Sequence, residues 1–150
     1  MKESDYRKNV GAMVVDSQGK ILVGEASFCP GEWMMPQGGI KSGEAPLEAL
    51  WRELEEETGI CQQQAEIIGE YPDWLYYTLR KPLTEQGRTF LGQKQKWFVL
   101  RYEGPIPNVE DVLDQEFLQF RRASASWLLE RTAHVKTSVY KTLFDFFSLR

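Results

Sequence analysis

The sequence is poor in cysteine and histidine and has no long apolar run. Of its 150 residues two are Cys and one is His, and Cys29 and Cys61 fit no paired metal-ligand spacing. Two isolated cysteines do not make a disulfide framework, which is typical of a reducing cytosol, and we expect both to be small buried residues. Without a signal-like N-terminal stretch or a membrane-length apolar segment, we expect a cytoplasmic protein that has no membrane partner.

Several catalytic motifs are also missing. There is no GxSxG elbow and only His134 as a histidine, so a Ser–His–Asp mechanism is not supported, and there is no GK[ST] phosphate loop. We expect His134 to be a surface or helix-start residue. The net charge of −4 argues against binding nucleic acid mainly by bulk electrostatics. It leaves open whether the Lys and Arg residues between positions 80 and 96 form a basic groove or ordinary solvated loops.

The patterning predicts a single domain over residues 1–150, because no linker, repeat or low-complexity tract divides the chain. Residues 9–15 and 21–25 read as a hairpin and residues 44–58 as a helix. Further strands are expected at 66–73, 74–79, 96–102 and 117–122, and an apolar stripe at helical spacing over 135–147 predicts a closing helix. This order indicates an α/β sandwich around a mixed sheet.

The predicted helix over residues 44–58 has two distinct faces. An apolar stripe of Leu47, Leu50, Trp51 and Leu54 faces the core, and three glutamates stand at i, i+3 and i+4 on a neighbouring face. These are Glu53, Glu56 and Glu57, whereas Glu48 and Glu55 fall on the other flank. The cluster is either a solvated acidic surface or a half-open site for Mg²⁺, which prefers carboxylate oxygens and shares them with substrate phosphates.

Residues 38–60, GGIKSGEAPLEALWRELEEETGI, favour the metal site. Gly38, Glu44, Arg52, the three clustered glutamates and Gly59 stand at the spacing G-x5-E-x7-R-E-x2-E-E-x-G. This segment resembles the Nudix box at every defining position. The resemblance implies an α/β/α sandwich with a catalytic loop–helix–loop at about 38–60, and a hydrolase of phosphoanhydride bonds that uses Mg²⁺, for which Mn²⁺ could substitute.

The same resemblance assigns roles within the box. The backbone carbonyl of Gly38 and the carboxylates of Glu53, Glu56 and Glu57 would bind metal. Arg52 would orient the glutamates by ion pairing, and Glu44 would hold the start of the helix.

Four further segments narrow the resemblance: YRKNVG at 6–11, MPQGGI at 35–40, DWLYYTL at 73–79 and GQKQKWF at 92–98. Together they are similar to the Nudix branch that contains bacterial RNA pyrophosphohydrolases and diadenosine polyphosphate hydrolases. This branch implies that substrate is bound by Arg7, Tyr77, Lys94, Lys96 and Lys136. Glu116 would be a metal ligand or the general base, although an exposed acid at a strand start would look the same.

Two departures bear on base recognition. The branch usually has an aromatic residue before the lysine that precedes the last helix, where it stacks on a base, but this chain has Val135 before Lys136. Lys8 replaces the proline of the motif YRPNVG. Val135 would therefore either face the base without stacking on it or simply begin the apolar stripe of the closing helix.

Three functions remain open from the sequence. The chain is expected to be an RNA 5′-pyrophosphohydrolase, a dinucleoside polyphosphate hydrolase, or a non-catalytic nucleotide-binding module that kept the fold. The complete set of three glutamates argues against the last, because binding alone would not need all of them. The substrate would be a nucleoside polyphosphate, with an RNA 5′ end favoured, and no obligate protein partner is implied.

Overall fold

The computed structural model describes residues 1–112 and 114–150, and in this part of the chain the strands form one eight-stranded mixed sheet. The strands are β1 (Tyr6–Val15), β2 (Ile21–Ala26), β3 (Trp33–Met34), β4 (Gln37–Gly39), β5 (Glu66–Glu70), β6 (Leu75–Glu85), β7 (Arg88–Arg101) and β8 (Phe117–Ala123). The helices are α1 (Pro46–Thr58), α2 (Ala125–Leu129) and α3 (Thr137–Phe146), with short 3₁₀ turns η1 (Glu3–Asp5), η2 (Val109–Asp111) and η3 (His134–Lys136).

The sheet is organised around β1. One edge of β1 runs parallel to β7 along its whole length, while the other edge pairs with β4 near Asn9 and with β2 only at Val15. The remaining strand pairs, β2–β3, β2–β8, β5–β7 and β6–β7, are antiparallel. β1 therefore has two different partners on one edge, and the sheet forks between them.

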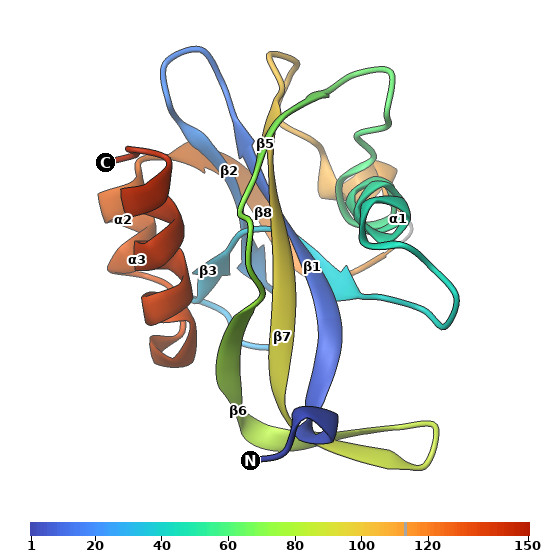
Figure 1. Ribbon diagram of the computed structural model, residues 1–150. Coiled ribbons are helices and arrows are strands. Elements are labelled where there is room, and N and C mark those ends of the chain that lie inside the picture. The colour runs from blue at the N-terminus through green and yellow to red at the C-terminus, as the bar shows by residue number, and fades with distance from the viewer. Residues whose placement is uncertain (113) are drawn as a thin grey trace.

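Helices cover both faces of this sheet (Figure 1): α1 lies on one side, and α2 and α3 lie on the other. The core accordingly has two parts. Leu50 and Leu54 of α1 pack with Val10 and Val14 on one face, and Tyr140 and Leu143 of α3 pack with buried residues such as Trp97 on the other. The predicted α/β/α sandwich around a mixed sheet is confirmed.

Helix α1 begins and ends where its sequence provides the right groups. The Glu48 side chain accepts a hydrogen bond from the Ala45 N–H at 2.9 Å, which satisfies one of the unpaired donors at the helix start, and Pro46 needs no such partner. At the other end Gly59 adopts a left-handed conformation, with φ of 79°, and donates its N–H to the Glu55 carbonyl. The helix begins two residues later than the predicted 44–58.

A long hairpin of β6 and β7 is the main feature that the sequence prediction missed. Residues 80–95 were not assigned to strands, but β6 continues to Glu85 and β7 begins at Arg88. The two-residue turn, Gln86 and Gly87, has positive φ at both positions, as a twisted hairpin requires. The strand pattern is weak here because most of these side chains are exposed and because the register shifts between Thr78 and Leu83.

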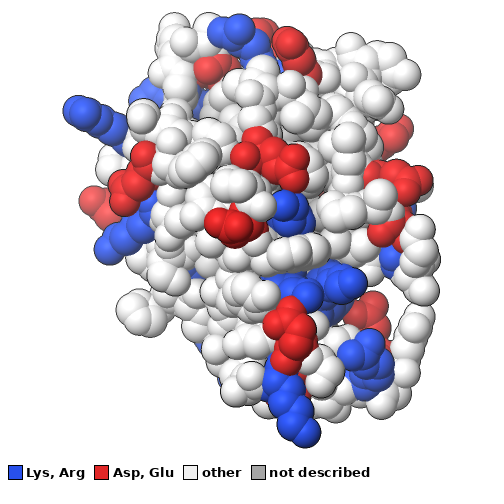
Figure 2. Space-filling model, in the orientation of Figure 1, with Lys and Arg blue, Asp and Glu red and all other residues white. Residues whose placement is uncertain are grey.

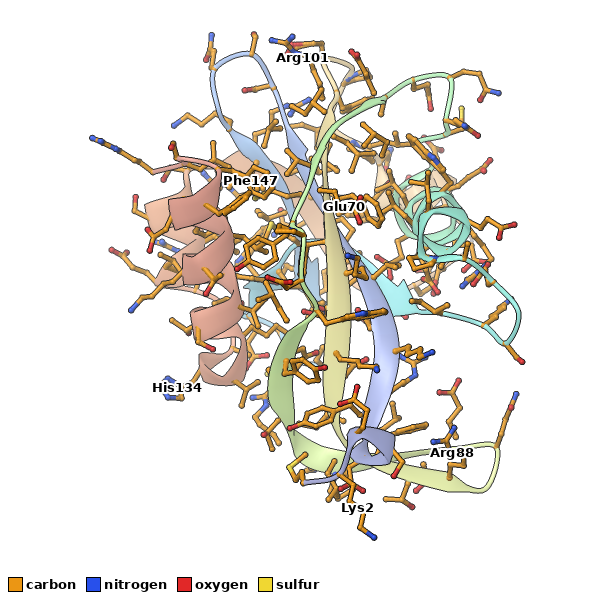
Figure 3. The ribbon with its side chains drawn as sticks, in the orientation of Figure 1. Lys2, Glu70, Arg88, Arg101, His134 and Phe147 are labelled. Carbon is orange, nitrogen blue, oxygen red and sulfur yellow. The ribbon has the colours of Figure 1, made fainter. Side chains whose placement is uncertain are left out.

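Three further expectations concern the two cysteines, His134 and helices that could cross a membrane. The prediction that both cysteines are buried is wrong: Cys29 and Cys61 lie in loops, where they are partly exposed free thiols. His134 begins η3 and points away from the sheet (Figure 3), as predicted for a surface residue. None of the helices in the described residues has both the length and the hydropathy that crossing a membrane needs.

Candidate active site

A cavity of about 650 Å³ lies where the sheet forks. Its walls come from β1, β4, β6, β7 and α1, together with the β2–β3 loop, the segment before β8, and η3. Six of the residues predicted from the sequence line it: Arg7, Gly38, Glu53, Tyr77, Glu116 and Lys136. Segments far apart in the chain thus bring carboxylates and cations into one space.

Glu57 is the most unusual carboxylate near this cavity. Its side chain is 1% exposed, and neither carboxylate oxygen has a hydrogen-bond partner among the described residues. Burial raises the pKa of Glu57 well above its ordinary value, and the nearby carboxylates of Glu116 and Glu53 raise it further. A buried, unpaired carboxylate is strongly unfavourable unless a cation or donor meets it. A divalent metal ion would supply such a partner.

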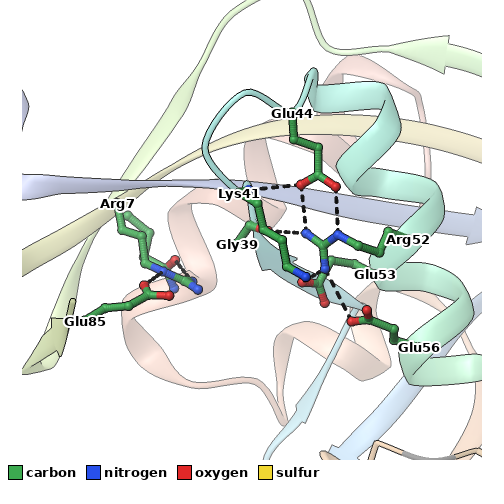
Figure 4. Close-up of polar contacts among 9 residues, drawn as sticks. Arg7, Gly39, Lys41, Glu44, Arg52, Glu53, Glu56 and Glu85 are labelled. Atoms are coloured by element: carbon green, nitrogen blue, oxygen red, sulfur yellow. Dashed lines mark hydrogen bonds and ion pairs between the residues drawn. The ribbon is translucent and has the colours of Figure 1, made fainter.

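Arg52 connects the glutamates of α1 (Figure 4). Its Nε and Nη2 donate to the two oxygens of Glu44 at 2.7 and 2.9 Å, and Nη2 also donates to the Gly39 carbonyl at 2.8 Å. Its Nη1 donates to Glu53 at 2.8 Å and to Glu56 at 3.3 Å. The hydrogen bonds from Arg52 lower the pKa of Glu44 to about 2, so this carboxylate stays charged. The observed contacts match the ion pairing expected of Arg52.

The three clustered glutamates differ in their surroundings. Glu53 lines the cavity with its side chain 16% exposed, whereas Glu56 is 46% exposed and lines a neighbouring groove together with Glu55. Within residues 1–112 and 114–150, no three His, Cys, Asp or Glu side chains converge closely enough to hold a metal ion on their own. Glu53 and Glu56 instead share the Arg52 guanidinium, so their assignment as metal ligands stays a prediction.

Two adjacent glycines let charged groups approach the backbone of β4. A Cβ atom on Gly38 would lie 2.0 Å from the carboxylate carbon of Glu53, and one on Gly39 would lie 2.1 Å from Nη2 of Arg7. Both distances are far inside van der Waals contact, so only glycine fits while Glu53 and Arg7 keep their positions. The backbone of Gly38 is therefore directly beside a predicted metal ligand.

Buried amides position the Tyr77 hydroxyl at the cavity wall. The Tyr77 oxygen accepts hydrogen bonds from Gln37 at 3.1 Å and from Gln93 at 2.8 Å. Gln93 also accepts from Asn9 at 2.9 Å, and Gln95 donates to both Asn9 and Gln37. Because the hydroxyl oxygen already accepts twice, its own O–H remains to be donated, and burial raises the pKa of Tyr77 so that the proton is retained.

Lys136 is a cation buried beside the same wall. Its Nζ lies 3.5 Å from the sulfur of Met34 and 6.0 Å from the centre of the Tyr77 ring. Burial lowers the pKa of Lys136 to about 8. Neither a thioether nor a ring face compensates an ammonium fully, so an anionic ligand in the cavity would find a strong partner here.

Arg7 reaches the cavity from β1 and is held by neighbouring strands. Its Nε donates to Glu85 at 2.6 Å (Figure 4). Its Nη1 donates to Gln93 at 3.3 Å. Glu85 lies near the tip of the β6–β7 hairpin, in the region that the sequence prediction left unassigned. The contact between Arg7 and Glu85 was therefore not predicted from the sequence.

Glu116 and Val135 also line the cavity. The pKa of Glu116 is raised, because its surroundings partly desolvate the carboxyl and because Asp114 lies nearby. Val135, in η3, borders the cavity and also packs against the core beneath α3. Its position is therefore compatible with facing a base and also with belonging to the apolar stripe of the closing helix.

The structure does not bring Lys94 and Lys96 to the cavity. Both extend from the face of β7 opposite Gln93 and Gln95 and lie against the Trp74 ring, where Lys94 pairs with Glu3 and Lys96 with Glu70. Charge favoured the lysines of GQKQKWF as substrate contacts, whereas the alternating residues Gln93 and Gln95 face the site. On the side seen in Figure 2, basic and acidic side chains are interspersed rather than gathered in one large basic field.

Sequence reasoning missed several residues of the cavity wall. Arg80, for which the sequence left open a basic groove or a solvated loop, lines the wall and forms two hydrogen bonds to Glu32, at 2.8 and 3.0 Å. Phe28, Gln37 and Gln93 line it as well. Two-residue alternation along β7 would have found Gln93, but nothing in the sequence places the β2–β3 loop beside β6.

Comparisons with known proteins agree on one family. A family model described as NUDIX domain matches residues 5–143. The RNA pyrophosphohydrolase of Roseobacter denitrificans is 39% identical over 95% of this chain and 91% of its own length. The RNA pyrophosphohydrolase of Gluconacetobacter diazotrophicus is 40% identical over 92% and 89%, respectively.

Solved structures support the fold. The chain resembles a C. elegans Ap4A hydrolase in a binary complex with a TM-score of 0.66 at 18% identity, covering 95% of this chain and 98% of that one. It resembles the MutT protein from Methanosarcina mazei with a TM-score of 0.65 at 20% identity, covering 99% of both chains.

Proposed function

The chain belongs to the NUDIX family of phosphoanhydride hydrolases, and within that family we propose that it removes pyrophosphate from the 5′-triphosphate end of RNA. The observation that supports this proposal is that carboxylates and cations line the same cavity. Carboxylates from α1 and from the segment before β8 meet there with the cations Arg7 and Lys136. A substrate with a polyphosphate chain needs both, because cations hold its phosphates and carboxylates hold a metal ion.

NUDIX hydrolases generally use divalent metal ions, and we propose Mg²⁺ for this chain, with Mn²⁺ as a substitute. Its ligands would be Glu53, Glu56, Glu57 and the Gly38 carbonyl, while Glu116 would act as the general base. The unpartnered carboxylate of Glu57 supports the fit, because burial without a cation is unfavourable. When bound, the metal would supply charge neutralisation and a more acidic water.

The protein's own groups then have distinct tasks. Arg52 holds Glu53 and Glu56 in position through the contacts described above. Arg7 and Lys136 neutralise phosphate charge, and Tyr77 donates its free O–H to a phosphate oxygen. Glu116, with its raised pKa, takes the proton of the attacking water.

The relatives support RNA as the substrate. Proteins named RNA pyrophosphohydrolase match at 39% and 40% identity across nearly the whole chain, whereas the resemblance to an Ap4A hydrolase structure, at 18% identity, concerns the fold. Lys94 and Lys96 stay candidates only for contacts outside the cavity, along a longer RNA.

Product analysis tests the proposal. Purified protein with Mg²⁺ is given a triphosphate-ended oligoribonucleotide and diadenosine tetraphosphate in parallel, and products are separated by chromatography. We expect pyrophosphate release and a 5′-monophosphate RNA, with a higher kcat/KM than for the dinucleotide. A higher kcat/KM for diadenosine tetraphosphate would instead favour a dinucleoside polyphosphate hydrolase. Cleavage of neither would contradict both substrate assignments.

A further inference from the structure

Phe28 is an aromatic side chain in an unusual place. It is 66% exposed and lines the cavity, although it is one of the larger hydrophobic residues of the chain. Among the described residues its ring takes part in none of the recorded aromatic or cation–π pairs. Exposing a ring to water forgoes the free energy that burying it would contribute.

The loop that carries Phe28 is firmly attached to its neighbours. Before the ring, the Ser27 N–H donates to the Glu116 carbonyl at 2.9 Å and its Oγ donates to the Gln115 carbonyl at 2.8 Å. After it, Glu32 forms the two-bond ion pair with Arg80 of β6. The backbone on both sides of Phe28 is therefore held in place, so the ring stands at the cavity on a fixed support.

The Phe28 ring lines the same cavity as the charged groups proposed to bind phosphate and metal. Ser27 contacts the backbone of Glu116, which lines the same cavity as Arg7 and Lys136. A substrate whose phosphates bind Arg7 and Lys136 would extend its first nucleotides along the same cavity, which Phe28 also lines. Val135, which lines the same cavity, has no ring and cannot stack on a base.

We propose that Phe28 supplies the platform on which a nucleobase of the substrate's 5′ end stacks. The inference rests on the proposed function, because it presumes a nucleotide substrate in this cavity. A flat, exposed ring on a fixed loop offers stacking at little entropic cost, and stacking accepts any base because every base has a π-face. Base binding would then rest on the β2–β3 loop rather than on Val135.

Steady-state kinetics of Phe28 variants on triphosphate-ended RNA tests this assignment. Phe28→Ala should raise KM by roughly 5- to 150-fold, the range for losing one stacked base, with kcat nearly unchanged because the metal-binding end is untouched. Phe28→Trp should restore KM, and Phe28→Leu, which keeps an apolar side chain without a ring, should not. Phe146→Ala is the matched control, because Phe146 is also exposed, at 55%, but lies on α3 outside the cavity.

Base-free substrates separate stacking from other effects. Wild-type protein and Phe28→Ala are assayed with two RNA substrates, one with an abasic ribose at the first nucleotide and one with an abasic ribose at the second. The KM of wild-type protein for one of them should rise to the value of Phe28→Ala, and the variant should lose no further affinity for it. Equal KM values for Phe28→Ala and wild type, or full rescue by Phe28→Leu, would overturn the proposal.

Failure of the proposed function gives a different result. If wild-type protein cleaves diadenosine tetraphosphate but not RNA, the RNA assignment is wrong, and the same Phe28 series is run on the dinucleotide. A rise in KM for Phe28→Ala on that substrate still supports the stacking platform, and an unchanged KM overturns it.

Discussion

Nζ of Lys136 has the sulfur of Met34, at 3.5 Å, as its one hydrogen-bond partner among the described residues. A buried ammonium beside a thioether destabilises the free protein, which fits the proposed role of this lysine in binding phosphate. Lys136→Met should make the protein more stable by roughly 1–3 kcal/mol at pH 7 while lowering kcat/KM. The measurements are thermal denaturation and RNA cleavage on the same samples. Lower stability together with unchanged cleavage would mean that Lys136 serves the fold.

The pH dependence of that destabilisation has a definite sign. Burial lowers the pKa of Lys136 from its ordinary value of 10.5 to about 8, so between these values the folded protein binds fewer protons than the unfolded chain. Lys136 therefore lowers the free energy of unfolding by its full amount below pH 8, and this loss disappears as the pH rises towards 10.5. In the same range kcat/KM should fall as the ammonium loses its proton. Lys136→Arg, which stays charged, should abolish this alkaline fall; the same fall in the arginine variant would assign it to another group.

The metal site is tested by comparing glutamates on one helix. Glu53→Gln, Glu56→Gln and Glu57→Gln should each reduce turnover on the order of 10²-fold or more, because each removes a charged ligand. Glu55→Gln is the control, because Glu55 is exposed beside Glu56 and makes no side-chain contact recorded for the described residues. It should stay within a few-fold of wild type. Equal losses at Glu55 and Glu56 would contradict the assignment.

Thermal denaturation gives a readout of the metal that does not depend on activity. Mg²⁺ at about 100 times its Kd should stabilise the wild-type protein by about 2.7 kcal/mol. Glu57→Gln should be more stable than wild type without Mg²⁺, because it removes a buried unpaired carboxylate, and should gain little when Mg²⁺ is added. A full Mg²⁺ shift in this variant would place the cation elsewhere.

Glu116 is tested as the general base. Glu116→Gln should lower kcat by roughly 10²–10⁴-fold with little change in KM, since the amide keeps the shape but cannot accept the proton. The comparison is made at saturating Mg²⁺, so that weaker metal binding does not lower kcat by itself. A kcat near that of wild type would assign the base to one of the helix glutamates.

Arg7 and Lys94 make a matched pair of cations from neighbouring strands. Arg7→Gln should raise KM for triphosphate-ended RNA by roughly 10- to 150-fold, the range for a charged hydrogen bond. Lys94→Gln should change KM less than a few-fold for a short RNA, because Lys94 pairs with Glu3 on the opposite face of β7. Similar losses in both variants would show that the substrate extends over the outer face of the sheet.

The sequence predicted the local parts of the site better than their assembly. Helical spacing brings Glu53 and Glu56 to the same Arg52 guanidinium, and this pairing followed from the family motif. Spacing did not predict that Glu57 is buried or that Glu56 borders a different groove from Glu53. Lys94 was expected to contact substrate phosphates, but strand alternation places it on the face of β7 opposite the cavity, so its contact with substrate stays a prediction. Because the β6–β7 hairpin was not predicted, the contact of Glu85 with Arg7 was not predicted either. Phe28 was missed since its role depends on the β2–β3 loop packing against β6, a contact between distant segments.

The parallel pairing of β1 with β7 bears on how the protein is made. Asn9 and Gln95 are 86 positions apart and hydrogen-bond in the centre of the sheet. During synthesis β1 therefore waits for its main partner until most of the chain has left the ribosome, and such distant pairings form slowly. Arg7 at one end of the chain meets Lys136 near the other in the same cavity. A chain truncated before β7 thus carries the complete acidic helix but lacks Lys136 and the main partner strand of β1, so we expect it to have no complete phosphate-binding cavity.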